Sequence, residues 1–209
     1  MHRIPFFKPG FLASAALCSL LSAEGARQTS LSLDGGTVTF DVGTNISAVS
    51  VHGKSSNVRG LARLRKEGAQ LILEEVAATL PVDALTTGMS LRDDHMKKYI
   101  FTTADQKLPE LKFTGSNMAC PVDAGGDGSC KITGKMTIRG IEKPLTVALK
   151  VKAGGTYRAI LDGAIKLSDY GIERPSQFGV KCADDVKIHI ELAGKETVES
   201  SASRAGGEK

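Results

Sequence analysis

Residues 131–152, KITGKMTIRGIEKPLTVALKVK, carry the pattern that decides the fold. Before the turn at GIEKP, Ile132, Met136 and Ile138 fall on one face, and lysine, threonine and arginine side chains fall on the other. After the turn, apolar residues recur at every second position of 145–151. This two-residue period is typical of a strand with one buried face. Two such strands joined by a short turn predict an antiparallel hairpin.

The same alternation recurs on both sides of this hairpin, and about eight strands are predicted in total. The other segments predicted as strands are 36–42, 45–53, 58–65, 69–85, 157–167 and 186–192, together with a strand that includes Phe113. Eight antiparallel strands can close into a barrel, which removes the unpaired edges of the sheet. No helical stretches of about 10–15 residues alternate with the strands, which excludes a parallel α/β sheet. A β-sandwich is the rival closure.

One segment, residues 86–113, breaks the alternation: TTGMSLRDDHMKKYIFTTADQKLPELKF. Ser90 followed by Asp93 is a variant of the capping box that begins many helices. The spacing predicts a short helix over 91–98, rich in charge but with enough apolar residues to pack on a larger hydrophobic body. We therefore expect a helical cap, inserted between two strands, over one end of the barrel.

The two ends of the chain are predicted to lie outside the folded domain. Residues 1–26 combine a basic start, an apolar run of 11 residues and an end of small residues, which is typical of a cleaved secretory signal peptide. The apolar run is well short of the roughly 20 residues of a membrane-spanning helix. We therefore expect a periplasmic or secreted protein with its domain over 27–195. The polar tail over 196–209 is predicted to be disordered.

Charge and cysteine content narrow the function further. The 27 Lys and Arg residues exceed the 23 Asp and Glu residues by only four; the surplus is scattered, which disfavours nucleic-acid binding. Cys120 and Cys130 flank a glycine-rich loop, and in an exported protein this arrangement predicts a disulfide. Metal ligation by these cysteines is disfavoured because no histidine lies nearby in the sequence. Cys182 is interpreted as a buried free thiol.

Three segments resemble the signatures of one family, the YceI-like polyisoprenoid-binding proteins. They are LRDDHMKKYIFTTADQKLPELKF, ITGKMTIRGIEKPLTVALKV, and LSDYGIERP followed by DDVKIHIEL. The resemblance extends from about residue 36 to 192. It implies an exported, lipocalin-like antiparallel barrel that holds an isoprenoid or a similar amphiphilic lipid in its interior. The residues that match the family pattern are Arg92, Asp93, His95, Pro109, Phe113, Gly140, Pro144, Asp169 and Gly171.

The candidate binding residues are the apolar side chains expected on the inner wall and on the cap. They are Phe40, Val42, Met96, Ile100, Phe101, Phe113, Met136, Ile138, Leu145 and Val147. Arg92, Asp93 and His95 are expected to anchor the cap to the barrel rim, with contact to a lipid head group as the alternative role. We expect no metal, and no cofactor other than the bound lipid.

An enzyme is disfavoured because no Gly-x-Ser-x-Gly motif occurs and no nucleophile, base and oxyanion hole are brought together. The predicted function is that of an exported soluble protein that binds or carries the lipid, as a monomer or homodimer. The alternative is a non-enzymatic protein-interaction module with a barrel filled by its own side chains, for example in a stress response. A lipid-acting enzyme using His95 is a third, weaker hypothesis, and transient membrane contact is left open.

Overall fold

The computed structural model describes residues 28–103, 105–153 and 156–197. The predicted signal peptide and residues 198–209 of the predicted tail lie outside this range. The strands are β1 (Gln28–Ser32), β2 (Thr37–Thr44), β3 (Ser50–Ser55), β4 (Arg59–Glu67), β5 (Gln70–Pro81), β6 (Glu110–Pro121), β7 (Gly128–Ile138), β8 (Ile141–Lys152), β9 (Tyr157–Lys166), β10 (Ser176–Gln177) and β11 (Val180–Glu196). The helical segments are η1 (Val82–Ala84), α1 (Ser90–His95), η2 (Met96–Phe101) and η3 (Leu167–Tyr170).

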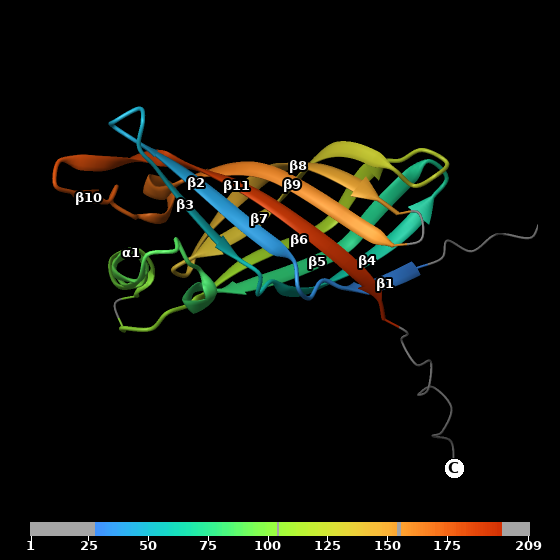
Figure 1. Cartoon of the computed structure of the whole chain (residues 1–209). Coiled ribbons are helices and arrows are strands. Elements are labelled where there is room, and N and C mark those ends of the chain that lie inside the picture. The colour runs from blue at the N-terminus through green and yellow to red at the C-terminus, as the bar shows by residue number, and fades with distance from the viewer. Residues whose placement is uncertain (1–27, 104, 154–155, 198–209) are drawn as a thin grey trace, which may run out of the picture.

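Eight of the strands form a closed antiparallel ring (Figure 1). Its order is β1-β4-β5-β6-β7-β8-β9-β11, and β1 closes the ring by pairing Leu31 with Glu196 of β11. The predicted eight-stranded antiparallel barrel is therefore confirmed. β11 spans 17 residues, long enough to pair with β1 at one end and with β2 along the rest of the same edge. β3 then pairs with β2 as an outer hairpin strand.

Two parts of the N-terminal half differ from the prediction. β1 was not expected, because its sequence QTSLS is short and has only Leu31 fully buried. The strand expected over 45–53 begins only at Ser50. Residues 45–49 form the turn between β2 and β3, where the backbone N–H of Val49 donates to the carbonyl of Ile46 at 2.8 Å.

A bulge in β5 explains why its apolar residues fall on both faces of an ideal strand. Leu73 and Val76 both face the barrel interior although they are three positions apart. Between them the β4–β5 ladder shifts register, and Glu74 has no partner in it. The Glu74 carboxylate instead accepts hydrogen bonds from Arg65 Nε at 2.7 Å and from Gln28 Nε2 at 2.5 Å. A one-residue bulge reverses the inward face of the strand.

The disulfide predicted between Cys120 and Cys130 is present and joins β6 to β7, with 5.5 Å between the Cα atoms. β6 and β7 pair directly over three residue pairs near the cap and meet again at the bridge between Val122 and Gly128. The disulfide lies beside that bridge, and Cys120 is fully buried. It therefore fastens these strands at the end of the barrel opposite the cap.

Within the described part of the chain, no helix has the length and the apolar content needed to cross a membrane.

Candidate ligand cavity and its cap

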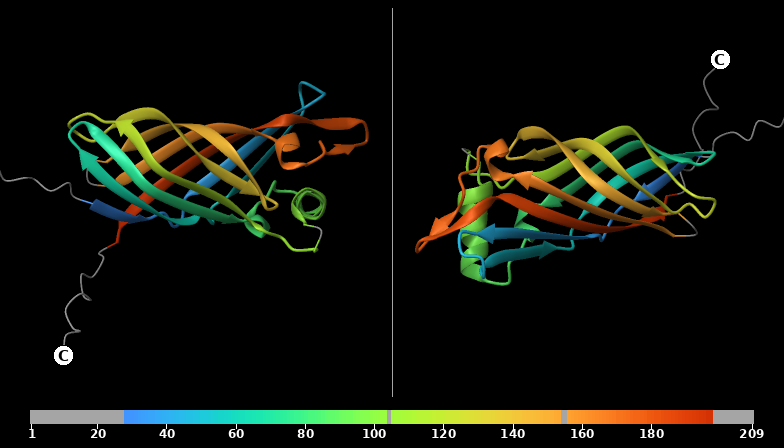
Figure 2. Two further views of the ribbon diagram at one scale, coloured as in Figure 1. Left: turned by 180° about the vertical axis from the view of Figure 1, so that it is seen from behind. Right: turned by 90° about the horizontal axis from the view of Figure 1, so that it is seen from above.

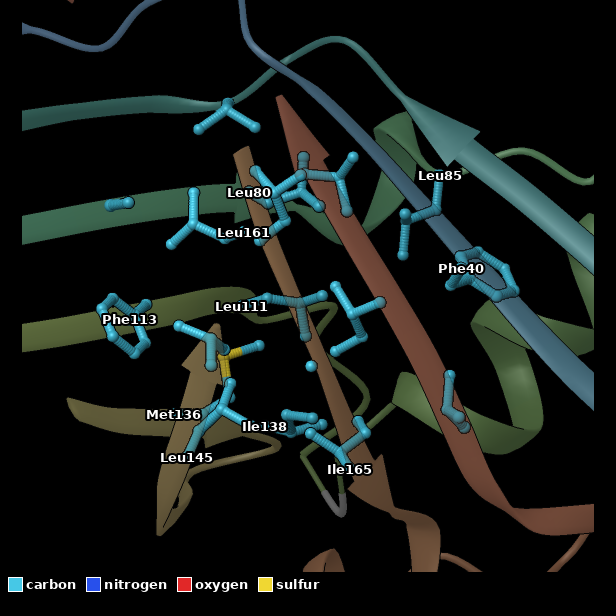
Figure 3. Close-up of a pocket in the computed structure, with 18 of the residues that line it drawn as sticks. Phe40, Leu80, Leu85, Leu111, Phe113, Met136, Ile138, Leu145, Leu161 and Ile165 are labelled. Atoms are coloured by element: carbon cyan, nitrogen blue, oxygen red, sulfur yellow. The ribbon is translucent and has the colours of Figure 1, made fainter. Parts of the chain in front are cut away.

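The inward faces of the strands enclose a cavity of about 990 Å³. Its wall consists mainly of valine, leucine and isoleucine side chains from strands all around the ring. Figure 3 shows Leu111 of β6, Met136 of β7, and Leu161 and Ile165 of β9 pointing into it, with Phe40 of β2 on the far side. The cavity is therefore the interior of the barrel itself.

Several inward-facing side chains remain partly accessible, which reflects the hollow that they face. Along β9, Leu161 and Ile165 point inward and are half-buried, whereas their outward neighbours Ile160 and Lys166 are exposed. Interiors filled by their own side chains pack densely and leave few voids larger than a water molecule. The partial accessibility of the inner wall thus distinguishes this barrel from one that is filled.

All ten apolar candidate residues named from the sequence line the cavity. They are Phe40, Val42, Met96, Ile100, Phe101, Phe113, Met136, Ile138, Leu145 and Val147. Three of them come from the cap, because η2 lies across one end of the barrel. Met96 also belongs to a buried cluster with Val58, Leu80 and Leu85. These three residues line the cavity as well, but they were not among the candidates named from the sequence.

The cap begins differently from the prediction. Met89, rather than Ser90, is the N-cap residue, and no side chain caps the helix. The predicted capping role of Ser90 is therefore wrong, because Ser90 is already the first residue of the helix. The Asp93 carboxylate, its expected partner, accepts hydrogen bonds from Thr86 and Thr87 instead. The predicted single helix over 91–98 is also divided: α1 ends at His95 and continues as a wider, π-helical segment, η2.

Asp93 connects the cap to the barrel wall. Its buried carboxylate accepts hydrogen bonds from Thr86 Oγ1 at 2.7 Å, from the Thr87 backbone N–H at 2.7 Å and from Thr87 Oγ1 at 2.5 Å. Burial raises the pKa of Asp93, but the hydrogen bonds from Thr87 and Thr86 outweigh it and hold the pKa below its usual value. Thr86 exchanges two backbone hydrogen bonds with Lys54 of β3. A chain of hydrogen bonds therefore runs from the cap to β3.

Arg92 and His95 make their contacts within the cap region, not with the barrel rim as expected. Arg92 Nε donates to Thr87 Oγ1 at 2.8 Å, and Nη2 donates to the Thr87 carbonyl at 3.0 Å. The His95 ring packs edge-on against Tyr99, with 5.5 Å between ring centroids. Both Arg92 and His95 line the cavity. Among the described residues, no carboxylate forms an ion pair with Arg92.

Cys182, which forms no disulfide, is half-buried on the cavity wall near Arg92. Burial raises the pKa of its thiol, and the Arg92 charge offsets this only in part. The thiol is therefore protonated at neutral pH, which makes it a weak nucleophile. No group of three or more His, Cys, Asp or Glu side chains is placed to hold a metal ion in residues 28–103, 105–153 and 156–197.

A closed antiparallel ring around one large apolar cavity, with a helix across its end, defines a ligand-binding barrel. The model of the YceI-like domain matches residues 30–193. The chain belongs to the YceI-like family.

Relatives and solved structures agree with this assignment. A UPF0312 protein of Pseudomonas paraeruginosa is 32% identical over 107 residues, which cover 48% of this chain and 53% of the relative. The chain thus spans about half the length of the curated relatives that it matches. A polyisoprenoid binding domain from Saccharophagus degradans has a TM-score of 0.58 at 16% identity, covering 82% of this chain and all of that domain. BcnA of Burkholderia cenocepacia has a TM-score of 0.57 at 20% identity, covering 75% and 95%.

Proposed function

We propose that this protein binds or carries a lipid with a long apolar chain, of the isoprenoid type or similar, inside its barrel. The hollow interior is the observation that carries the proposal, because a closed barrel with an unfilled apolar cavity suits one elongated apolar ligand. The same hollow argues against the alternative of an interaction module filled by its own side chains. Family membership supports binding in preference to catalysis.

The cavity volume sets the length of chain that fits. At about 30 Å³ for each group of about the size of a water molecule, 990 Å³ accommodates about thirty such groups, which corresponds to about six five-carbon units. Each unit contributes at most about 4 kcal/mol, taking about 0.8 kcal/mol for each buried carbon group. Two or three units are therefore enough to overcome the free-energy cost of association.

Arg92 is the candidate partner for a polar head group. Arg92 lines a mainly apolar cavity, and Thr87 accepts hydrogen bonds from only some of its N–H groups. Because no carboxylate in the described part of the chain forms an ion pair with it, this guanidinium favours a head group that carries negative charge or accepts hydrogen bonds. We propose that an amphiphilic lipid binds with its head beside Arg92 and its chain along the barrel.

The proposal includes export to the periplasm or to the outside of the cell, with cleavage of the signal peptide near residue 26. The Cys120–Cys130 disulfide supports this, because disulfides persist in oxidising compartments. The intact mass of protein recovered from the producing cells tests the cleavage, which the proposal places near Ala26.

Native mass spectrometry of the purified protein, followed by organic extraction, tests lipid binding. The expected result is one hydrophobic ligand per chain. A matched pair of variants on β5 gives the control: Ala78 lines the cavity, whereas Ala77 does not. Ala78→Asp places a carboxylate in the ligand's path and is expected to lower occupancy, while Ala77→Asp is expected to retain the ligand. A wild-type protein without any lipid, or equal occupancy in both variants, counts against the proposal.

A further inference from the structure

Three segments that carry exposed apolar side chains lie together at the capped end of the barrel. They are the β2–β3 turn, the first turns of the cap, and the β10–β11 turn, all at the same end of the barrel in Figures 1 and 2. Their exposed apolar residues are Ile46, Val49, Met89, Leu91, Tyr99 and Phe178. Both ends of the described chain, at β1 and β11, lie at the opposite end.

Phe178 is the most unusual of these residues. It is 95% exposed and occupies the first position of a two-residue turn whose φ angles are +51° at Phe178 and +80° at Gly179. Turns with two positive φ angles favour asparagine, aspartate or glycine at the first position. The left-handed conformation brings Cβ too close to the following carbonyl oxygen, so a phenylalanine here carries a conformational cost.

Phe178 also differs from the other non-glycine residues that have positive φ angles. Four described non-glycine residues have positive φ angles, and the other three, Gln106, Asn117 and Arg139, are polar. The Phe178 ring, by contrast, is apolar and almost entirely in solvent, so burial within the chain does not offset its conformational cost. An interaction outside the chain would offset it.

The Phe178 turn is held in place by its neighbour. Asn45, at the start of the β2–β3 turn, donates through Nδ2 to the Gly179 carbonyl at 3.0 Å and accepts from the Lys181 N–H at 2.8 Å. The backbone N–H of Asn45 also donates to the Lys181 carbonyl at 2.9 Å. The two turns therefore present Phe178, Ile46 and Val49 together on a fixed frame.

We propose that this end of the barrel, the apolar rim formed by the six residues named above, docks on the surface of a lipid bilayer and inserts Phe178 into it. Five of the six, all but Ile46, also line the cavity, so the apolar surface is continuous from the interior to the tip. The choice of a bilayer rests on the proposed function, because a lipid moving between membrane and cavity needs an apolar path that avoids water.

The charges behind the rim agree with this orientation. Residues 175–180 are uncharged, and the first charged residues on either side are Arg174 and Lys181. Lys98 Nζ lies 5.1 Å from the centre of the Tyr99 ring. When the rim is inserted, these cations and the Tyr99 ring would lie near the boundary between acyl chains and head groups, where such side chains are favoured. Asp94 and Glu173 lie close in sequence to Lys98 and Arg174 and offset their positive charge. Insertion of apolar side chains, rather than net charge, is therefore the main source of membrane affinity.

A tryptophan reporter tests the docking directly. The chain contains no tryptophan, so Phe178→Trp introduces a single fluorophore at the tip, and Leu61→Trp introduces one at an exposed apolar position of β4 outside the cavity lining. With vesicles of phosphatidylcholine and phosphatidylglycerol, the Phe178→Trp emission is expected to shift to the blue and to be quenched by acyl-chain bromine. The Leu61→Trp emission is expected to be unchanged. Absence of a shift in Phe178→Trp overturns the proposal.

Vesicle flotation of Phe178→Asn provides the second arm. Asparagine suits the left-handed turn, so the melting temperature is expected to stay constant or rise, whereas vesicle binding falls about tenfold, as expected for loss of a buried phenylalanine side chain. Equal flotation of the wild type and Phe178→Asn overturns the docking. If flotation depends on Phe178 but native mass spectrometry finds no bound lipid, the docking is supported and only the proposed function is contradicted.

Discussion

The length of the cavity limits the length of lipid chain that can bind, and one substitution at the end opposite the cap is expected to shorten the cavity. Ala159 lies on the inner wall of β9, opposite Val151 of β8 and Leu192 of β11. Ala159→Phe adds about six carbon atoms to the wall, which is about the size of one five-carbon unit. The chain length that fills the barrel should therefore fall from about six units to about five.

The magnitude follows from the buried area that is lost. One unit contributes at most about 4 kcal/mol, so the Kd of a six-unit ligand is expected to rise by up to about three orders of magnitude. Ligands of two to four units, which end short of Ala159, are expected to retain their affinity. The measurement is the Kd of prenyl alcohols of two to eight units, in competition with an environment-sensitive dye. In the wild type, affinity should increase with each unit and then level off.

The matched control is Ile160→Phe on the same strand, because Ile160 points outward and is absent from the cavity wall. It is expected to leave the length dependence unchanged. A plateau at the same length in Ala159→Phe and the wild type, or an equal change in both variants, would refute the reasoning.

Three further substitutions test the cap, the disulfide and a surface histidine. Asp93→Asn replaces one acceptor oxygen by an NH2 group, which faces the hydroxyl and N–H donors of Thr86 and Thr87. The free energy of local opening of the cap should fall by about 1–3 kcal/mol, measured by hydrogen exchange of residues 86–101. Because the pKa of Asp93 is lowered, the stability that its carboxylate contributes is present above about pH 3.9 and is lost as pH falls through the lowered pKa. Joint replacement of Cys120 and Cys130 by serine should cost about 2–3 kcal/mol and lower the melting temperature by about 5–10 °C. The pKa of His189 is raised, chiefly by its hydrogen bond to Asp162. The stability that the charged imidazole contributes is therefore complete below about pH 6.5 and is lost as pH rises through the raised pKa. The melting-temperature difference between wild type and His189→Gln should shrink over the same rise in pH.

Each of these expectations has a result that contradicts it. Unchanged exchange in Asp93→Asn would mean that the Thr86 and Thr87 contacts do not hold the cap. Equal melting temperatures with and without the disulfide would mean that the β6–β7 seam is stable by itself. A melting-temperature difference for His189→Gln that is constant from pH 5.5 to pH 8.5 would mean that the imidazole charge does not contribute.

The barrel could be predicted from the sequence because most strands have one buried and one wet face. In β8 every inward position from Leu145 to Val151 is buried, and every intervening residue is exposed. The pattern failed where the chain departs from a regular ladder. The bulge at Glu74 depends on the register of β4, and β1 has too few apolar residues to be distinguished from a loop until it closes the ring with β11.

The apolar cavity residues could be predicted because alternation alone assigns inward positions. The hollow itself could not, because the same valine and leucine residues fill a smaller or differently sheared barrel. The contacts of the cap were also beyond the sequence: Ser90 and Asp93 match a capping box, yet Thr86 and Thr87 bind the carboxylate instead. Phe178 carried a usable signal, since a Phe-Gly pair at a hairpin turn is unusual.

Electron density inside the barrel, in crystals of the protein purified from its producing cells, shows whether the cavity holds a lipid. Lipid binding predicts a continuous elongated feature along the cavity, with one end beside Arg92 and the other among the inner side chains of β8 and β9. A barrel interior that has collapsed onto its own side chains, or one filled only by ordered water, would contradict it.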